Sequence, residues 1–408
     1  MVDGAKAHAL GALEVAVGPP SVPVKSNPIA ADAGEAAGVF WSFHPSELQV
    51  YRDTAVHFRI DALPKEHADA SCRWDFGDGS APVDGCATSH TFKGGRAAQT
   101  VALEIRHGDW RLQSTRILPL ERLSVTTAGE PSETSPPEDG GLPSRPGAGP
   151  TDFRMVLLAE TARGDQVNAA VETMLAVAKP ALVLHVGGVV TTGAGDAGWD
   201  NARDTVGRPI RGAKVPLVWA MSPVDLAEGA RVRRPEVTLV DAKTYPERYT
   251  FTFKGAFFMV ISSSAETGLS EDDLSWMRAR LDEAQVYPSR FVVSHLPLHP
   301  FSEVSGGAIN HKFQVYELML RARVTAFISA GHRVYYKGRY GALPVVSVGP
   351  LVGAGGRLSG HDFVQRPSFA VMDVKDGVPQ RIFAVEGPSF EVVVDEDYLP
   401  EAVEVYTQ

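Results

Sequence analysis

Two short stretches decide the fold of the larger part of this chain: residues 292–300 read VVSHLPLHP and residues 329–336 read SAGHRVYY. Each stretch begins within a short apolar run that is typical of a buried strand. The run is Phe291–Ser294 for the first stretch and Thr325–Ser329 for the second. The residues around Phe313–Arg323 between them have a helical pattern. Strand, helix and strand in succession indicate an α/β domain.

The same alternation extends outward from these stretches, beginning after Thr151. Ser270 is predicted to cap a helix, because Asp273 follows three residues later and an apolar stripe of Leu274, Met277 and Leu281 comes next. The tail from Leu343 onward returns to β patterning. We predict an α/β fold built on a sandwich of sheets and flanked by helices. Its other expected elements are strands at Met155–Ala159, Ala181–Val186, Pro216–Ala220, Phe257–Ser262, Val345–Val348, Phe369–Val374, Ile382–Val385 and Phe390–Val394 and a helix at Asp165–Lys179.

The first third of the chain has a different pattern. From Val39 to Leu123, apolar residues alternate with polar ones in short runs, which is typical of β-strands, and no long helix is indicated. Residues 126–150 are crowded with Pro, Gly, Ser and acidic side chains, so they are expected to form a linker between domains. Residues 1–37 are rich in Ala, Gly, Pro and Val without a period, and are expected to form a tail or an extended strap.

Composition narrows the classes of partner. The formal net charge is -10, and no run of basic residues stands out, so nucleic acid and anionic membrane surfaces are disfavoured as partners. No apolar stretch is long enough to cross a bilayer. The N-terminus of this chain lacks the continuous apolar segment of a secretory signal. Cys72 and Cys86 flank a loop of the first domain, where either a disulfide or two free thiols would fit, and a disulfide would favour an oxidising compartment.

One motif of the first domain is specific. Residues 74–80 read WDFGDGS, and residues 90–92 read HTF. Alternation directs Trp74 and Phe76 into the domain and leaves Asp75 at the surface, while the glycines supply a tight turn. The motif resembles that of the PKD domain, an immunoglobulin-like β-sandwich of surface proteins and extracellular enzymes. The resemblance implies a role in protein or carbohydrate contacts or as a spacer, with a structural role for Asp75 and Asp78.

The second domain resembles the calcineurin-like metallophosphoesterases, in a form similar to purple acid phosphatases. These enzymes hold two metal ions at strand ends through five motifs: D-x-H, G-D, G-N-H-D, a lone His and G-H-x-H. The two ions hold the phosphate oxygens and generate hydroxide, which requires a dense set of ligands and one bridging carboxylate. His295 matches the lone His, and Gly331 with His332 matches the start of the last motif.

Most of the other family ligands are absent. In place of D-x-H, this chain has Glu160-Thr161-Ala162, and in place of the bridging aspartate of G-D it has Gly188. Ser222-Pro223-Val224-Asp225 stands in place of G-N-H-D. Val334 replaces the second histidine of the last motif. Without the bridging carboxylate, nothing offsets the repulsion between two cations, so we expect no dinuclear centre. What remains is His295, His332 and Asp225 as remnants of a catalytic site.

Glu160, His295 and His332 could still form a single-metal site, since two imidazoles and a carboxylate with an open position suit zinc or a similar divalent ion. The alternative is that these side chains hydrogen-bond to neighbouring backbone and hold no cofactor. Ser294 beside His295 does not suggest a nucleophile pair, because adjacent strand residues point to opposite faces. His299 and His311 lie in loops beside this site and could line a pocket, but ordinary surface histidines are the favoured interpretation. Residues 193–198 match G-x-G-x-x-G, but no long helix is evident after them, so a flexible loop is predicted.

The favoured function is that of a non-catalytic phosphoesterase-type scaffold with a PKD module, acting in protein or glycan binding, adhesion or assembly. A metal-dependent phosphoesterase with a mononuclear or rebuilt site is the alternative, and a third possibility gives the main role to the PKD module. The PKD resemblance and the cysteines favour an extracellular, periplasmic or cell-surface location. The domain prediction is a tail at 1–37, the PKD-like sandwich at 38–125, a linker at 126–151, the phosphoesterase-like fold at 152–388 and a C-terminal β extension at 389–408.

Overall fold

The computed structural model describes residues 39–44, 51–93, 96, 98–120, 125–127, 149–162, 166–230, 247–262, 268–303 and 307–403. The chain forms two compact units. Among the described residues, the smaller unit contains those from 39 to 120 and the helix Lys312–Arg321, and the larger contains those from 125 to 311 and from 322 to 403. The predicted N-terminal tail and residues 128–148 of the predicted linker lie outside the described residues.

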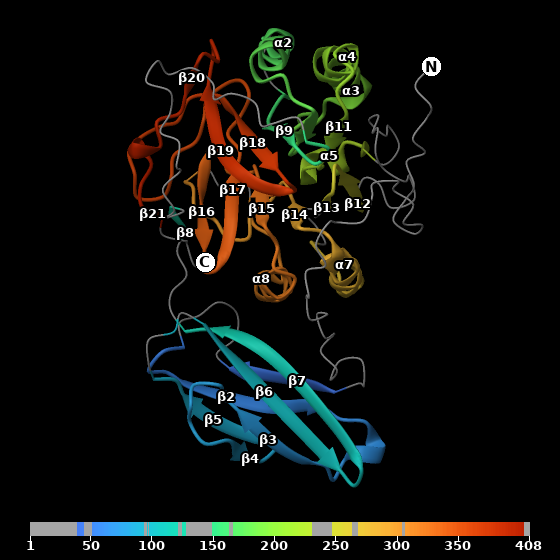
Figure 1. The fold of residues 1–408 in the computed structure, drawn as a ribbon, viewed down its shortest axis with the longest axis vertical. Helices are drawn as coiled ribbons and strands as arrows, with labels where there is room; N and C mark the ends of the chain where they lie inside the picture. The colour runs from blue at the N-terminus through green and yellow to red at the C-terminus, as the bar shows by residue number, and fades with distance from the viewer. Residues whose placement is uncertain are drawn as a thin grey trace. The chain divides into compact units, whose positions relative to one another are not determined.

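The smaller unit is built from antiparallel β-sheets (Figure 1). One sheet has the order β1 (Phe40–His44), β2 (Ala55–Ala62) and β5 (Ala87–Thr91), and the other the order β4 (Val83–Asp84), β3 (Ser71–Asp75), β6 (Ala98–His107) and β7 (Trp110–Pro119). A short 3-10 helix, η1, spans Lys65–His67. Alternate residues of β2, β3 and β6 are buried, as the sequence pattern predicts. Their side chains form one apolar core, to which Phe313 of α8 (Lys312–Arg321) also belongs.

In the WDFGDGS corner, the alternation predicted from the sequence is confirmed. Trp74 and Phe76 are fully buried, whereas Asp75 is exposed and accepts a hydrogen bond from the Gly77 amide at 2.8 Å. His90 stacks on Phe76 with ring centroids 4.0 Å apart, and its Nε2 lies 2.8 Å from Asp78 Oδ2. Burial alone would raise the pKa of Asp78, but hydrogen bonds from Ser80 and His90 outweigh it and lower the pKa to about 2. The polar groups of this corner therefore fix the turn.

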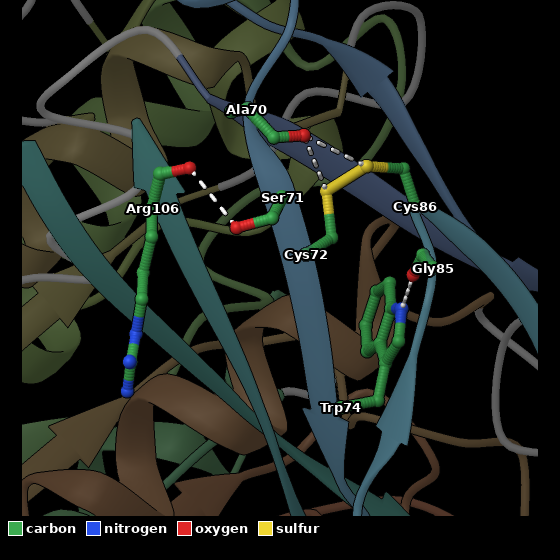
Figure 2. Close-up of a disulfide and its surroundings, with 7 residues drawn as sticks. All are labelled: Ala70, Ser71, Cys72, Trp74, Gly85, Cys86 and Arg106. Atoms are coloured by element: carbon green, nitrogen blue, oxygen red, sulfur yellow. Dashed lines mark hydrogen bonds between the residues drawn. A yellow bond between two sulfur atoms is a disulfide. The ribbon is translucent and has the colours of Figure 1, made fainter. Parts of the chain in front are cut away.

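Cys72 and Cys86 form a disulfide between β3 and the segment before β5, with Cα atoms 5.0 Å apart (Figure 2). The carbonyl oxygen of Ala70 lies 3.8 Å from Cys72 Sγ and 3.5 Å from Cys86 Sγ. Below the disulfide, Trp74 Nε1 donates to the Gly85 carbonyl at 2.8 Å. Of the two states that the sequence left open, the structure has the disulfide.

The larger unit contains two mixed sheets. The six-stranded sheet has the order β11 (Leu217–Trp219), β10 (Leu182–His185), β9 (Phe153–Leu158), β18 (Ser368–Lys375), β19 (Val378–Glu386) and β20 (Val392–Val393), with β9, β10 and β11 parallel. The eight-stranded sheet has the order β12 (Arg248–Phe253), β13 (Ala256–Ile261), β14 (Ser289–Val293), β15 (Ala326–Ser329), β17 (Leu343–Ser347), β16 (Tyr336–Tyr340), β8 (Val125–Thr127) and β21 (Ala402–Val403). Within it, β13, β14, β15 and β17 run parallel.

Helices lie on both sides of these sheets, which confirms the predicted α/β class. Figure 1 shows α2 (Val167–Ala178), α3 (Gly195–Ala202) and α4 (Arg208–Gly212) on one side of the strands and α7 (Glu271–Glu283) on the other. Ser270 and Asp273 form the predicted capping box of α7. The remaining short helices are η2 (Arg203–Gly207), α5 (Pro223–Ala227), η3 (Ala284–Val286) and η4 (Glu396–Tyr398).

The prediction of a flexible loop at residues 193–198 was wrong. Gly195 begins α3, and the Gly193 amide donates to Glu228 Oε1 at 2.6 Å. The carboxylate of Glu228, which comes after α5, accepts this amide and that of Gly195. Gly193 and Gly195 have positive φ values of 76° and 55°, so the turn into the helix requires their conformational freedom. The sequence pattern gave no sign of this distant partner.

The centre of the six-stranded sheet contains a buried ion pair. Arg154 Nε donates to Asp373 Oδ1 at 2.7 Å, and Arg381 Nη2 donates to Asp373 Oδ2 at 2.9 Å. Asp373 is fully buried, so its charge requires both guanidinium groups. In the part of the chain that the structure describes, no helix has the length and apolar character needed to span a membrane.

Candidate functional site

The candidate site is the set of segments that follow β9, β10, β11, β14 and β15, here called the strand-end loops (residues 159–162, 186–190, 220–225, 294–295 and 330–333). Parallel strands bring their carboxyl ends to one edge of a sheet. Backbone hydrogen bonds join the loops: Glu160 N donates to Gly187 O at 2.9 Å, and Gly331 N donates to His295 O at 2.8 Å. His295 Nδ1 lies 2.8 Å from Val186 O and so connects the two sheets.

Glu160 is held by an arginine. Its Oε2 accepts from Arg333 Nη1 at 2.9 Å, and Arg333 also donates from Nη2 to the Ala354 carbonyl at 2.8 Å. The side chains of Arg333 and Glu160 are 28% and 17% exposed, so the pair is partly shielded from water. Glu160 has a φ of 55°, a left-handed conformation that is uncommon for a residue other than glycine. The carboxylate predicted as a metal ligand is therefore already paired with a cation of the protein.

Gly188 lies at the position where the sequence resemblance led us to expect a bridging aspartate, and the space beside it is filled. A Cβ atom at Gly188 would lie 2.5 Å from Glu160 Oε1 and 3.0 Å from Glu160 Cα. At Gly187, a Cβ atom would lie 2.5 Å from His295 Nδ1. Both glycines have positive φ, of 87° for Gly187 and 74° for Gly188. Side chains at these two positions would displace Glu160 and His295.

The carboxylate of Asp225 accepts hydrogen bonds from backbone amides. Its Oδ1 accepts from the amides of Val189 and Val190, both at 2.9 Å, and its Oδ2 accepts from Gly188 at 3.1 Å and Ser222 at 2.8 Å. Ser222 Oγ accepts from the Asp225 amide, which completes a capping box at α5. Burial raises the pKa of the Asp225 carboxyl, and the amide hydrogen bonds oppose that rise. Asp225, predicted as a catalytic remnant, is fully occupied in holding the loop after β10.

His332 is fully buried and contacts the segment after β14. Its Nδ1 accepts from the Phe301 amide at 3.4 Å, and its carbonyl accepts from Ser302 Oγ at 3.2 Å. Burial lowers the pKa of His332 to about 4, so the imidazole is neutral at pH 7. The ring packs against Phe301 with an angle of 58° between the ring planes and centroids 4.7 Å apart. These contacts bind His332 to neighbouring backbone.

The structure brings Glu160 and His295 together, with 3.8 Å between Glu160 Oε1 and His295 Nε2. Among the described residues, no group of three His, Cys, Asp or Glu side chains is arranged to hold a metal ion. Arg333 pairs with Glu160, and backbone amides occupy both oxygens of Asp225. The residues present therefore do not fit a dinuclear centre, and they do not assemble the predicted zinc ligand set.

Two residues at this edge of the sheets were missed by the sequence predictions: Arg333 in the last strand-end loop and His185 at the end of β10. Arg333 directly follows His332 in SAGHRVYY, and a basic residue at that position was the available signal. His185, the last residue of β10, is fully buried, with Nδ1 accepting from Gly187 N at 3.2 Å and Nε2 donating to Thr161 Oγ1 at 2.8 Å. Burial lowers the pKa of His185 to about 3. The favoured interpretation of His299 and His311 as surface histidines was wrong for His299, which is buried, packs on Tyr340 and lines a small pocket.

Comparisons with known proteins give matches of low sequence identity among solved structures. No protein-family model matches the chain. No curated protein matches it either. Among solved structures, the chain is similar to GAP50, the anchor in the inner membrane complex of Plasmodium, with 15% identity and a TM-score of 0.46 over 63% of this chain and 90% of that chain. It is also similar to TT1561 of Thermus thermophilus, with 13% identity and a TM-score of 0.40 over 58% and 99% of the two chains. A further similar structure is Vacuolar Protein Sorting 29 from Cryptosporidium parvum, with 11% identity and a TM-score of 0.32 over 63% and 99%.

Proposed function

We propose that this protein is a non-catalytic scaffold in which a phosphoesterase-type fold has exchanged its metal site for contacts within the protein. The smaller unit is, on this proposal, a PKD-type module, and the protein acts by binding other molecules. The order of the remaining motifs, with Glu160, Gly188, Asp225, His295 and His332 each following a strand, supports the family part of the proposal. The WDFGDGS corner and its two antiparallel sheets support the PKD part.

The observation that carries the proposal is the Arg333–Glu160 ion pair beside Gly188. A divalent cation needs several anionic or neutral donors, and a guanidinium placed among them repels it. Arg333 Nη1 lies 2.9 Å from the one carboxylate that remains from the first motif. Glu160 Oε1 also occupies the space into which a side chain at Gly188 would project. The charge of Arg333 and the lack of a carboxylate at Gly188 therefore both disfavour metal binding at this edge of the sheet.

The proposal is tested by metal content and hydrolysis. We expect the purified full chain to contain much less than one Zn, Mn or Fe per molecule, and to hydrolyse an aryl phosphate at the rate of the buffer alone, with or without added metal. Stoichiometric metal together with turnover that is lost in His332→Ala would show instead a metal-dependent phosphoesterase. His361→Ala is the control for metal on surface histidines, because His361 is partly exposed and lies outside the strand-end loops.

We propose an oxidising location for the protein, outside the cell, in a periplasm or at the cell surface. The Cys72–Cys86 disulfide supports this, since such bonds persist mainly in oxidising compartments. Protein from its natural source, alkylated before and after reduction, should bind alkylating reagent at both cysteines only after reduction. Alkylation of both without reduction would contradict the proposed location. The expected partner is a protein or a carbohydrate, bound through the smaller unit or through the strand-end loops.

A further inference from the structure

A groove of about 340 Å³ lies beside the last strand of the six-stranded sheet, β20. Phe363, Val392 and Tyr398 line it, and they are 58%, 54% and 76% exposed. Single exposed apolar side chains are ordinary on a protein surface, but a group of them around one groove is typical of an interaction site. The groove contains none of the strand-end loop residues, so it is a separate surface.

The strand that borders the groove has an open edge. β20 pairs with β19 on one side, and it is the terminal strand of its sheet among the described residues. Val394 N donates to Ala384 O of β19 at 2.8 Å. Because consecutive residues of an antiparallel strand direct their backbone groups to opposite sides, the N–H and C=O of Val393 point away from β19. Such an edge is able to accept a further strand.

The charges around the groove indicate what charge the added strand should carry. After Arg381 the sequence contains no lysine or arginine, whereas acidic residues recur up to the end of the chain. Glu391, Asp395 and Asp397 are exposed next to β20 and η4. Arg366 also lines the groove, but its charge is paired with Glu386 at 2.8 Å. The rim is therefore acidic, and it favours a basic partner.

We propose that β20 and this groove bind an extended segment of a partner protein in which apolar residues alternate with lysine or arginine. Successive side chains of a strand point to opposite faces. In an added strand, one set would pack on Phe363, Val392 and Tyr398, and the basic set would reach the acidic rim. Backbone hydrogen bonds to Val393 would supply the pairing, and the alternation would supply the selectivity.

The test uses the full chain and a fluorescent ten-residue peptide of alternating valine and lysine, with anisotropy as the readout. We expect saturable binding that is weakened about tenfold or more by Val392→Lys, since this places a like charge on the pairing edge, and also by Tyr398→Ser. Val286→Lys is the matched control, because Val286 is 61% exposed and lies on η3 outside the groove. It should change the affinity less than about twofold.

Two further peptides separate the parts of the proposal. A peptide with glutamate in place of lysine should not bind, and equal binding would overturn the role of the acidic rim. A peptide of the same charge with proline at alternate apolar positions cannot pair as a strand, and it should bind about tenfold more weakly. Equal binding of the proline peptide, or equal affinity of Val392→Lys and Val286→Lys, would overturn binding at the β20 edge. These measurements involve no metal and no hydrolysis, so their failure is distinct from failure of the proposed scaffold function.

Discussion

The WDFGDGS corner of the smaller unit and the strand-end loops of the larger unit use the same residue types in opposite ways. In the corner, the side chains of Asp78 and His90 contact each other at 2.8 Å and are partly exposed to water. His332 in the loops and His185, which precedes one of them at the end of β10, are fully buried, and burial lowers the pKa of each. Both regions fix backbone turns. The difference is that the loops do so with polar groups that are removed from water. Lowering the pH, or making a conservative substitution, should therefore reduce the stability of the larger unit more than that of the smaller one.

The largest expected effect is a loss of stability of the larger unit in mild acid. His185 and His332 have folded pKa values of about 3 and about 4, against 6.5 in a model compound. Between these values and 6.5 the unfolded chain binds protons that the folded chain does not, so stability falls as the pH falls below 6.5. From pH 7 to pH 5 each histidine should cost about 2 kcal/mol, or about 4 kcal/mol for the pair.

Urea titrations of the full chain at each pH, read by hydrogen exchange in peptides from each unit, check this expectation. Asp78 has its pKa lowered to about 2, so its contribution is complete above about pH 4 and does not change over the same interval. The His185→Gln variant should remove about half of the pH dependence of the larger unit. Equal losses of stability in the two units would contradict the contrast.

The second effect concerns two aspartates. Asp225 accepts four backbone hydrogen bonds while fully buried, and Asp75 accepts one from Gly77 while exposed. In Asp225→Asn, the side-chain NH₂ group faces backbone N–H donors, so these buried donors lose their acceptor. The free energy of unfolding should fall by about 3 kcal/mol. Asp75→Asn should cost about 0.5 kcal/mol, as expected for an exposed turn. Urea midpoints of the two variants measure the difference, and equal costs would show that the loop after β10 rearranges without Asp225.

How far the sequence predicted the molecule depends on the range of the interactions. The capping box of Ser270 and Asp273 is local, and so is the burial of Trp74 and Phe76 by alternation, and both predictions are confirmed. The Arg333–Glu160 pair joins residues far apart in the sequence, and Gly193 binds Glu228 in the same way. No local pattern contains these pairings. The absence of a carboxylate at Gly188 was visible in the sequence, but the side chain that fills its place was not.

The smallest effect compares two glycines with positive φ, Gly188 of the loops with a φ of 74° and Gly79 of the corner with a φ of 89°. An alanine at either position adopts an unfavourable left-handed conformation, at about 1 kcal/mol. Nothing lies within 4 Å of a Cβ at Gly79, whereas a Cβ at Gly188 would meet Glu160 at 2.5 Å. Gly188→Ala should therefore cost about 1 kcal/mol more than Gly79→Ala in urea titrations, because Glu160 must move away from Arg333. Equal costs would mean that Glu160 moves aside at no cost in free energy, so that the space beside Gly188 could hold a larger side chain.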